Sequence, residues 1–146
     1  MPRRDGNDRF AKPESESTFS ARRQYQFRQS KWFSDDMRDL GWEAAERTKA
    51  KLQQFIDDWH ANVSEADLVR KFELKIPKAD PSCRRLGLRQ VRFINKVRAY
   101  FTIVDEQRVI WLLSIGFKEG SAWQDAEIKR ACQHARTIRE RDHERN

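Results

Sequence analysis

The sequence predicts an α+β fold: a small antiparallel sheet of about four strands, with N-terminal helices packed on one face and a C-terminal helix. Apolar residues recur at helical spacing over 42–59 and again over 128–138, which predicts two amphipathic helices. Between them, residues 91–115 alternate in hydropathy as strands do. A chain of 146 residues is long enough for one domain with a modest core, but not for two.

The chain begins with a segment that we expect to be a disordered, mildly basic tail, residues 1–23. This segment mixes charged residues with Ser, Pro and Gly, and its large apolar groups are Phe10 and Phe19. Two such groups bury too little surface to offset the entropy lost on ordering. Residues 25–29 then alternate Tyr, Phe and Gln with polar neighbours, which predicts a short first strand.

Two or three helices are predicted before the sheet continues. Ser34, followed by two aspartates, suits a helix start, because the hydroxyl can cap it and carboxylates favour the positive end of the helix dipole. Ser64 and Asp67 have the spacing of a capping box and predict a short helical turn. The longest helix has one apolar face for packing on a sheet, formed by Trp42, Ala45, Leu52, Phe55, Ile56 and Trp59.

The next two strands meet around residues 94–96, and the apolar pattern selects their register. A two-residue turn would put Arg92 on the face of the apolar residues, whereas a three-residue connection pairs Arg92 with Arg98 and Phe93 with Val97. We therefore predict the second register. Directly opposed arginines repel each other by up to ~1 kcal/mol unless an anion lies between them, so this pair hints at an anion. The face opposite the core then carries Gln90, Arg92, Arg98 and Tyr100.

The C-terminal part is predicted to hold a central strand and a closing helix. Residues 109–115 are apolar on both faces, as in a central strand. Ser121 can cap the last helix, and residues 141–146 read as a charged tail. The buried stripe of this helix is predicted to hold Ile128, Ala131, Cys132, Ala135 and Ile138.

The charge of the chain favours an acidic partner such as nucleic acid. Lys and Arg total 30 against 23 Asp and Glu, which gives a formal net charge of +7. Most of this charge is of mixed sign and solvates the surface. Cations on a rigid sheet can be aimed at phosphates at little entropic cost. One cluster lacks carboxylates, and it consists of Arg84, Arg85, Arg89, Arg92, Lys96 and Arg98.

Cysteine and histidine usage bears on the compartment and on metals. With two cysteines and no apolar leader segment, we expect a reducing compartment, a non-secreted protein and a cytoplasmic location. No apolar run reaches the roughly 18 residues that a membrane span needs. The three histidines lack metal-ligand spacing, and no Gly-rich loop is present to cradle a phosphate. We therefore expect no metal site and no cofactor.

Two consecutive segments resemble a known family. Residues 97–105, VRAYFTIVD, and 109–119, VIWLLSIGFKE, are similar in order and spacing to the RelE/ParE superfamily of toxins from type II toxin–antitoxin systems. In that pattern a strand bearing Arg and Tyr ends in Asp, and an apolar strand follows that ends in Gly-x-Lys/Arg. The resemblance implies a toxin domain over residues 24–140, with its specific motifs in 89–130.

The RelE branch is favoured, and this resemblance implies a toxin that cuts mRNA on the ribosome without a metal. Its antitoxin would hold it inactive, and any operator DNA would be bound only through that antitoxin. The RNA 2′-hydroxyl would attack while basic residues move protons and neutralise charge on phosphorus. Arg98 and Lys118 match the catalytic positions. The expected RNA-binding residues are Arg89, Gln90, Arg92, Lys96, Tyr100 and Trp123.

The chain departs from that pattern near its C-terminus. RelE-type enzymes usually place a Tyr or His there, where this chain has Trp123 and Gln124. An indole can stack on a base but cannot accept a proton. Two alternatives therefore stay open. One is a non-enzymatic ParE-like toxin that inhibits a protein such as DNA gyrase, and the other is an unrelated small basic nucleic-acid-binding domain.

Overall fold

The computed structural model describes residues 22–145, with side chains through residue 141, so nearly all of the predicted tail over 1–23 lies outside the described residues. No helix in this described range is long and apolar enough to cross a membrane. The last helix continues through Arg145, into the predicted charged tail. In chain order the elements are β2 (Gln26–Gln29), α2 (Lys31–Asp39), α3 (Trp42–His60), α4 (Glu65–Phe72), α5 (Pro81–Arg84), β3 (Leu88–Arg92), β4 (Val97–Val104), the 3-10 helix η1 (Asp105–Gln107), β5 (Val109–Phe117) and α6 (Ser121–Arg145).

The predicted α+β class with a four-stranded sheet is confirmed. The strand order is β2-β5-β4-β3, and β3–β4 and β4–β5 pair in antiparallel fashion. β2 pairs in parallel with β5, so the sheet is mixed rather than wholly antiparallel. A long connection through four helices separates β2 from the other strands, and no hairpin forces it to run antiparallel. β5 is an inner strand, as its apolar faces predict.

The predicted hairpin register is also confirmed. Arg92 lies opposite Arg98, and the Phe93 N–H donates to the Val97 carbonyl at 3.2 Å. The turn closes with the Val97 N–H donating to the Ile94 carbonyl at 3.0 Å. Lys96 takes a left-handed conformation with φ of 64°, which a three-residue connection needs at its last position. The alternation of apolar and polar residues along β3 and β4 therefore determined which side chains lie on the same face of the sheet.

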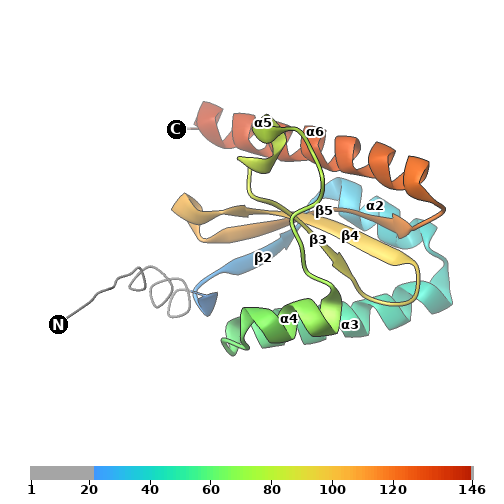
Figure 1. Cartoon of the computed structure of the whole chain (residues 1–146). Coiled ribbons are helices and arrows are strands. Elements are labelled where there is room, and N and C mark those ends of the chain that lie inside the picture. Colours follow the sequence, from blue (N-terminus) through green and yellow to red (C-terminus); the bar gives the residue numbers. More distant parts are fainter. Residues whose placement is uncertain (1–21, 146) are drawn as a thin grey trace.

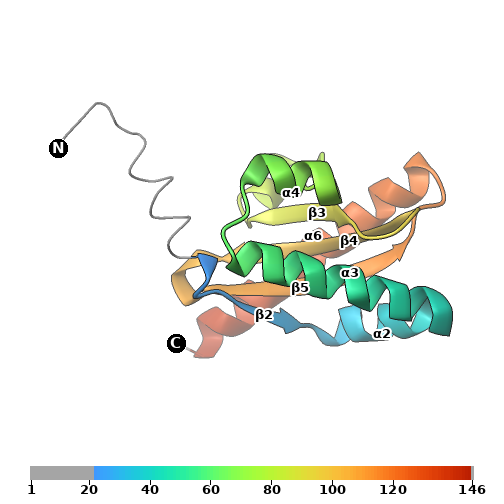
Figure 2. The same ribbon diagram turned by 90° about the horizontal axis from the view of Figure 1, so that it is seen from below.

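Helices cover both faces of the sheet (Figures 1 and 2). α3 and α4 lie on one face, where the larger core forms around the aromatic rings of the helices and strands. α6 lies across the other face together with the short α5. The smaller core beneath α6 contains Cys83, Leu88, Tyr100, Leu113, Ile128, Ala131, Cys132, Ala135 and Ile138.

Phe55 is the centre of the larger core, and its removal should be costly. Its ring is fully buried, and the ring centroid lies 5.1 Å from that of Phe72 and 5.6 Å from that of Phe101. Phe55→Ala should lower the free energy of unfolding by about 3–5 kcal/mol, because it loses buried area and leaves a cavity. Urea denaturation measures this loss. Trp42→Ala, on a residue that is 82% exposed, should change it by under ~0.5 kcal/mol, and equal losses in the two variants would contradict this core.

Two local predictions were wrong. Helix α2 begins at Lys31, and its N-cap is Ser30, whose hydroxyl accepts from the Phe33 N–H at 3.1 Å. The predicted start at Ser34 was four residues late, because both serines precede helix-forming residues. Trp42 does not face the core, since the first turn of α3 extends past the sheet. The Ser64 cap is confirmed, with its hydroxyl accepting from the Asp67 N–H at 3.1 Å.

Candidate functional site

Four of the predicted site residues gather at one end of the sheet. Arg98 lies on β4 opposite Gly116 of β5, two residues before Lys118. The Lys118 N–H donates to the Lys96 carbonyl at 2.5 Å, which joins the end of β5 to the β3–β4 turn. Arg98 thus lies on β4, and Lys118 directly follows the neighbouring strand β5. We call this group the cationic end; it consists of Arg92, Lys96, Arg98 and Lys118.

The four cations differ in what neutralises them. Arg92 forms an ion pair with Glu73 at 2.5 Å, so a carboxylate of the chain supplies the anion that the opposed arginines predict. Arg98 is half-buried, and its Nη1 has no hydrogen-bond partner within residues 22–145. Lys96 is exposed and Lys118 half-buried. Three of the cations are therefore free of ion pairs in the described part of the chain and can meet an anionic ligand.

The face expected to be open is covered by α6. Tyr100 is fully buried and Gln90 is 3% exposed. The Gln90 Oε1 accepts from the Gln124 amide at 3.3 Å, so β3 is hydrogen-bonded to the first turns of α6. The apolar stripe of α6 needs a sheet face to bury, and this is the face left by α3 and α4. Contact between RNA and Gln90 or Tyr100 stays a prediction, and it requires α6 to move.

Tyr100 has an environment that suits a hydrogen-bond donor rather than a base. Its hydroxyl and that of its cross-strand neighbour Ser114 are buried without partners among the described residues. Burial, followed by the nearby Glu127 carboxylate, raises the pKa of Tyr100 well above its usual range, while Arg98 opposes this shift. The phenol therefore stays protonated at neutral pH and cannot accept a proton there.

Trp123 packs against Gly116, the residue of β5 that lies opposite Arg98. A Cβ atom built on Gly116 would lie 3.0 Å from the Trp123 Cζ2, so a larger residue there would make the indole shift by a few tenths of an ångström. The indole is half-buried. This contact is the packing role that a tryptophan near a helix start commonly has, and the stacking of Trp123 on an RNA base stays a prediction.

Arg89 is not part of the group. It lies next to Gln90 on β3, and neighbouring strand residues point to opposite faces, so Arg89 faces α4. Its Nη1 donates to the Leu88 carbonyl at 3.0 Å, and burial lowers the pKa of its guanidinium. Arg89 and Gln90 were both expected to bind RNA, and the pleat of β3 places them on opposite faces of the sheet.

A network missed by the sequence analysis holds α6 over the sheet. The Asp36 carboxylate accepts from the Ile115 N–H at 3.1 Å and from Arg130 at 2.7 Å. Arg130 also bonds Glu127 at 3.0 Å, and this network joins α2, β5 and α6. The bond to Asp36 raises the pKa of Arg130, whereas burial raises the pKa of Glu127. Asp36 had been interpreted only as a favourable charge near a helix start.

A disulfide makes a second attachment of α6. Cys83 of α5 and Cys132 of α6 are joined, with their Cα atoms 5.7 Å apart. From the sequence we expected two thiols, as in a reducing compartment. The two cysteines are 49 positions apart, and this spacing does not indicate that they pair, because only the fold brings α5 beside α6.

A stacked pair of aromatic rings is the third attachment of α6 to the rest of the fold, and its contribution to stability should depend on pH. His134 of α6 stacks on Trp32 of α2, with ring centroids 3.9 Å apart and planes 8° from parallel. Burial, and then the Arg130 charge, lowers the pKa of His134 to about 4, with Asp36 opposing. Its ordinary value is near 6.5, so the unfolded chain takes up the proton first as pH falls.

Neutral His134 should therefore contribute fully to the free energy of unfolding above pH ~6.5. This contribution should be lost progressively as the pH falls toward 4. Urea denaturation at intervals between pH 7.5 and 4.5 measures this loss. His134→Gln should flatten that part of the profile, because the amide does not titrate. A variant profile with the same slope as the wild type would show that other groups cause the acid sensitivity.

Comparisons with known proteins give structural neighbours only. Neither a family profile nor a curated protein sequence matches the chain. The isolated RelE toxin of E. coli is similar at 19% identity and a TM-score of 0.45, covering 73% of this chain and 97% of that toxin. The archaeal RelE–RelB complex from Pyrococcus horikoshii is similar at 15% identity and a TM-score of 0.44, covering 65% and 96%. At these values, a function for this chain has to be argued from its own residues.

Proposed function

We propose that this protein is the toxin of a toxin–antitoxin pair and that it cleaves mRNA on the ribosome without a metal. The observation that carries the proposal is the cationic end, where Arg98 lies on β4 and Lys118 directly follows the neighbouring strand β5, both without ion-pair partners in residues 22–145. Cations fixed on strands are preorganised for a phosphate, because little entropy is lost when they meet it. The net charge of +7 favours encounter with RNA.

The proposed chemistry needs only groups on the chain and on RNA. The 2′-oxygen attacks phosphorus, the bond to the 5′-oxygen breaks, and the products are a 2′,3′-cyclic phosphate and a 5′-hydroxyl. Arg98 offsets the negative charge that builds on the phosphoryl oxygens in the transition state. Lys118 donates the proton that the leaving 5′-oxygen takes up.

One observation favours a second candidate, a toxin that inhibits a protein target without cutting RNA. The cationic end contains no His, and the phenol nearest to it, Tyr100, is buried with a raised pKa. Since Lys118 is the proton donor in this scheme, a ribonuclease here would have to pass the 2′-proton to a phosphate oxygen or to a ribosomal group. A binding surface for an acidic protein segment needs no base.

Induced expression in bacteria tests the proposal. Growth, translation and mRNA 5′ ends are followed after induction, with co-expression of any acidic protein encoded in the adjacent reading frame. We expect arrest, new 5′ ends within translated frames, and rescue by that partner. Arrest without new 5′ ends would support the second candidate. Without arrest, the toxin proposal would be wrong and salt-sensitive binding to naked nucleic acid would be the next measurement.

A further inference from the structure

A pocket lies far from the cationic end, where the C-terminal half of α6 passes the start of α2. Its volume is 280 Å³, at the lower end of the range for small-molecule sites. Trp111 lies near the start of β5 and Lys118 directly after its end, so the pocket is ~20 Å along the strand direction from the proposed catalytic lysine. The lining residues are Gln29, Ser30, Lys31, Trp32, Trp111, Ile138 and Arg141.

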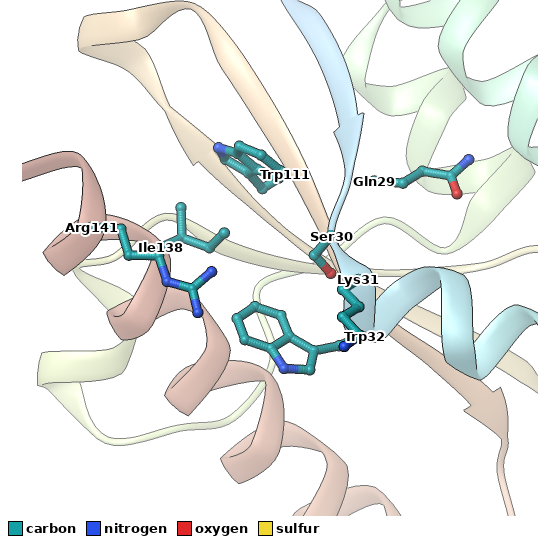
Figure 3. A pocket seen from close by; sticks show the side chains of 7 residues that line it. All are labelled: Gln29, Ser30, Lys31, Trp32, Trp111, Ile138 and Arg141. Carbon is teal, nitrogen blue, oxygen red and sulfur yellow. The ribbon is translucent and has the colours of Figure 1, made fainter. Parts of the chain in front are cut away.

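The walls of this pocket are mainly flat and apolar. Figure 3 shows Trp32, Ile138 and Arg141 pointing toward one another, with Trp111 across the opening and the Gln29 side chain directed away. The His134 ring stacks on Trp32 and so holds that indole in one orientation. Two indoles and an aliphatic side chain can contact the faces of an aromatic ring without needing its polar edge.

The charge at the pocket is entirely positive. Lys31 and Arg141 line it, and the Arg141 guanidinium lies 5.8 Å from the Trp32 ring centroid. Arg28 lies 5.9 Å from the centroid of Trp111. No carboxylate lines the pocket, and none pairs with these three cations in the part of the chain that the structure describes. The preferred ligand is therefore an anion.

We propose that this pocket binds a nucleotide, with the base against Trp32 and Trp111 and the phosphate on Arg141 and Lys31. Aromatic walls beside unpaired cations match a planar base joined to a phosphate. A base alone would leave the cations without an anion, and a phosphate alone would leave the indoles without a ring to stack on. The pocket is of a size for one such unit. This inference goes beyond the proposed function: no step of it requires cleavage, and it holds whether the nucleotide is free or is one residue of a single-stranded RNA.

Indole N–H resonances of the full chain provide the test, because Trp32 and Trp111 can be followed separately from Trp42, Trp59 and Trp123. The probes are the four ribonucleoside monophosphates, a single-stranded oligoribonucleotide, inorganic phosphate and adenosine. We expect saturable shifts of Trp32 and Trp111, with Trp42 unmoved. Arg141→Ala should weaken binding about tenfold or more, since it removes a charged hydrogen bond to the phosphate.

Lys129→Ala is the matched control, because Lys129 is an exposed cation of α6 that does not line the pocket. This variant should bind as the wild type does. Shifts with monophosphates would assign a free nucleotide, and shifts with the oligonucleotide alone would assign an RNA residue. The proposal would be overturned by equal binding of inorganic phosphate, by Arg141→Ala binding as tightly as wild type, or by no shift with any nucleotide. Adenosine binding as tightly as the monophosphates would also overturn it, because the phosphate would then contribute nothing.

Discussion

Arg98→Ala/Lys118→Ala should lose both growth arrest and mRNA cleavage. Each residue is expected to stabilise or protonate an oxygen only as the transition state forms, and removal of one such group typically lowers a rate by ~10²–10³-fold. The loss in the double variant should therefore be at least about 10²-fold. Single-turnover cleavage of a programmed ribosome measures the rate directly, and growth after induction measures its consequence.

The fold of this variant should survive. The Lys118 side chain is half-buried and forms no ion pair, and the Arg98 Nη1 is already without a partner among the described residues. Arg47→Ala/Lys51→Ala is a matched control, because it also removes two positive charges, from exposed positions of α3. It should arrest growth as the wild type does. If Arg98→Ala/Lys118→Ala does so too, these residues are not toxin residues.

Removal of the Cys83–Cys132 disulfide should have the largest effect on stability outside the aromatic core. The bridge closes a loop with a sequence separation of 49 residues, for which the loop-entropy model gives about 4 kcal/mol. Both cysteines are buried, so Cys83→Ala/Cys132→Ala avoids placing hydroxyl groups in the smaller core. Urea denaturation with and without a dithiol reductant measures the difference.

Two outcomes separate the bridge from the packing around it. Reductant should lower the stability of the wild type toward that of the double variant and should leave the variant unchanged. Amide exchange along α6 should quicken in both reduced wild type and variant, because the helix then depends on the Asp36 network and the Trp32–His134 stack. Unchanged stability after full reduction would show that the other contacts of α6 hold it in place without the bridge.

The hairpin and its cations could be predicted because the required information is local. Phe93 and Val97 both have to reach the core, and the pleat then decides where Arg92 and Arg98 point. Lys118 follows from the same rule at the end of an apolar strand. The structure brings these cations to one end of the sheet, since neighbouring strands connected by short turns keep their order, and their roles stay predictions.

Other features depend on elements that meet only in the folded chain. Tyr100 was expected on an open face because the hairpin register places it on the same side as Arg92 and Arg98, yet α6 arrives from later in the sequence and buries it. Asp36 finds Ile115 and Arg130 across three elements. Nothing in the spacing of these residues indicates such contacts. The nucleotide pocket likewise combines the start of α2 with the last turns of α6.

The parallel strand β2 imposes an order on folding during synthesis. Its neighbour β5 is far ahead in the chain: Ser30 donates to the Leu113 carbonyl across 83 residues. β3, β4 and β5 are joined by short turns, and such local pairs form early, whereas distant pairs must first close a long loop. A ribosome that adds residues from the N-terminus therefore releases β2, α2 and α3 well before their sheet exists. The nascent chain cannot close its larger core until β5 has left the exit tunnel, so the cationic end and its scaffold mature together, late in translation.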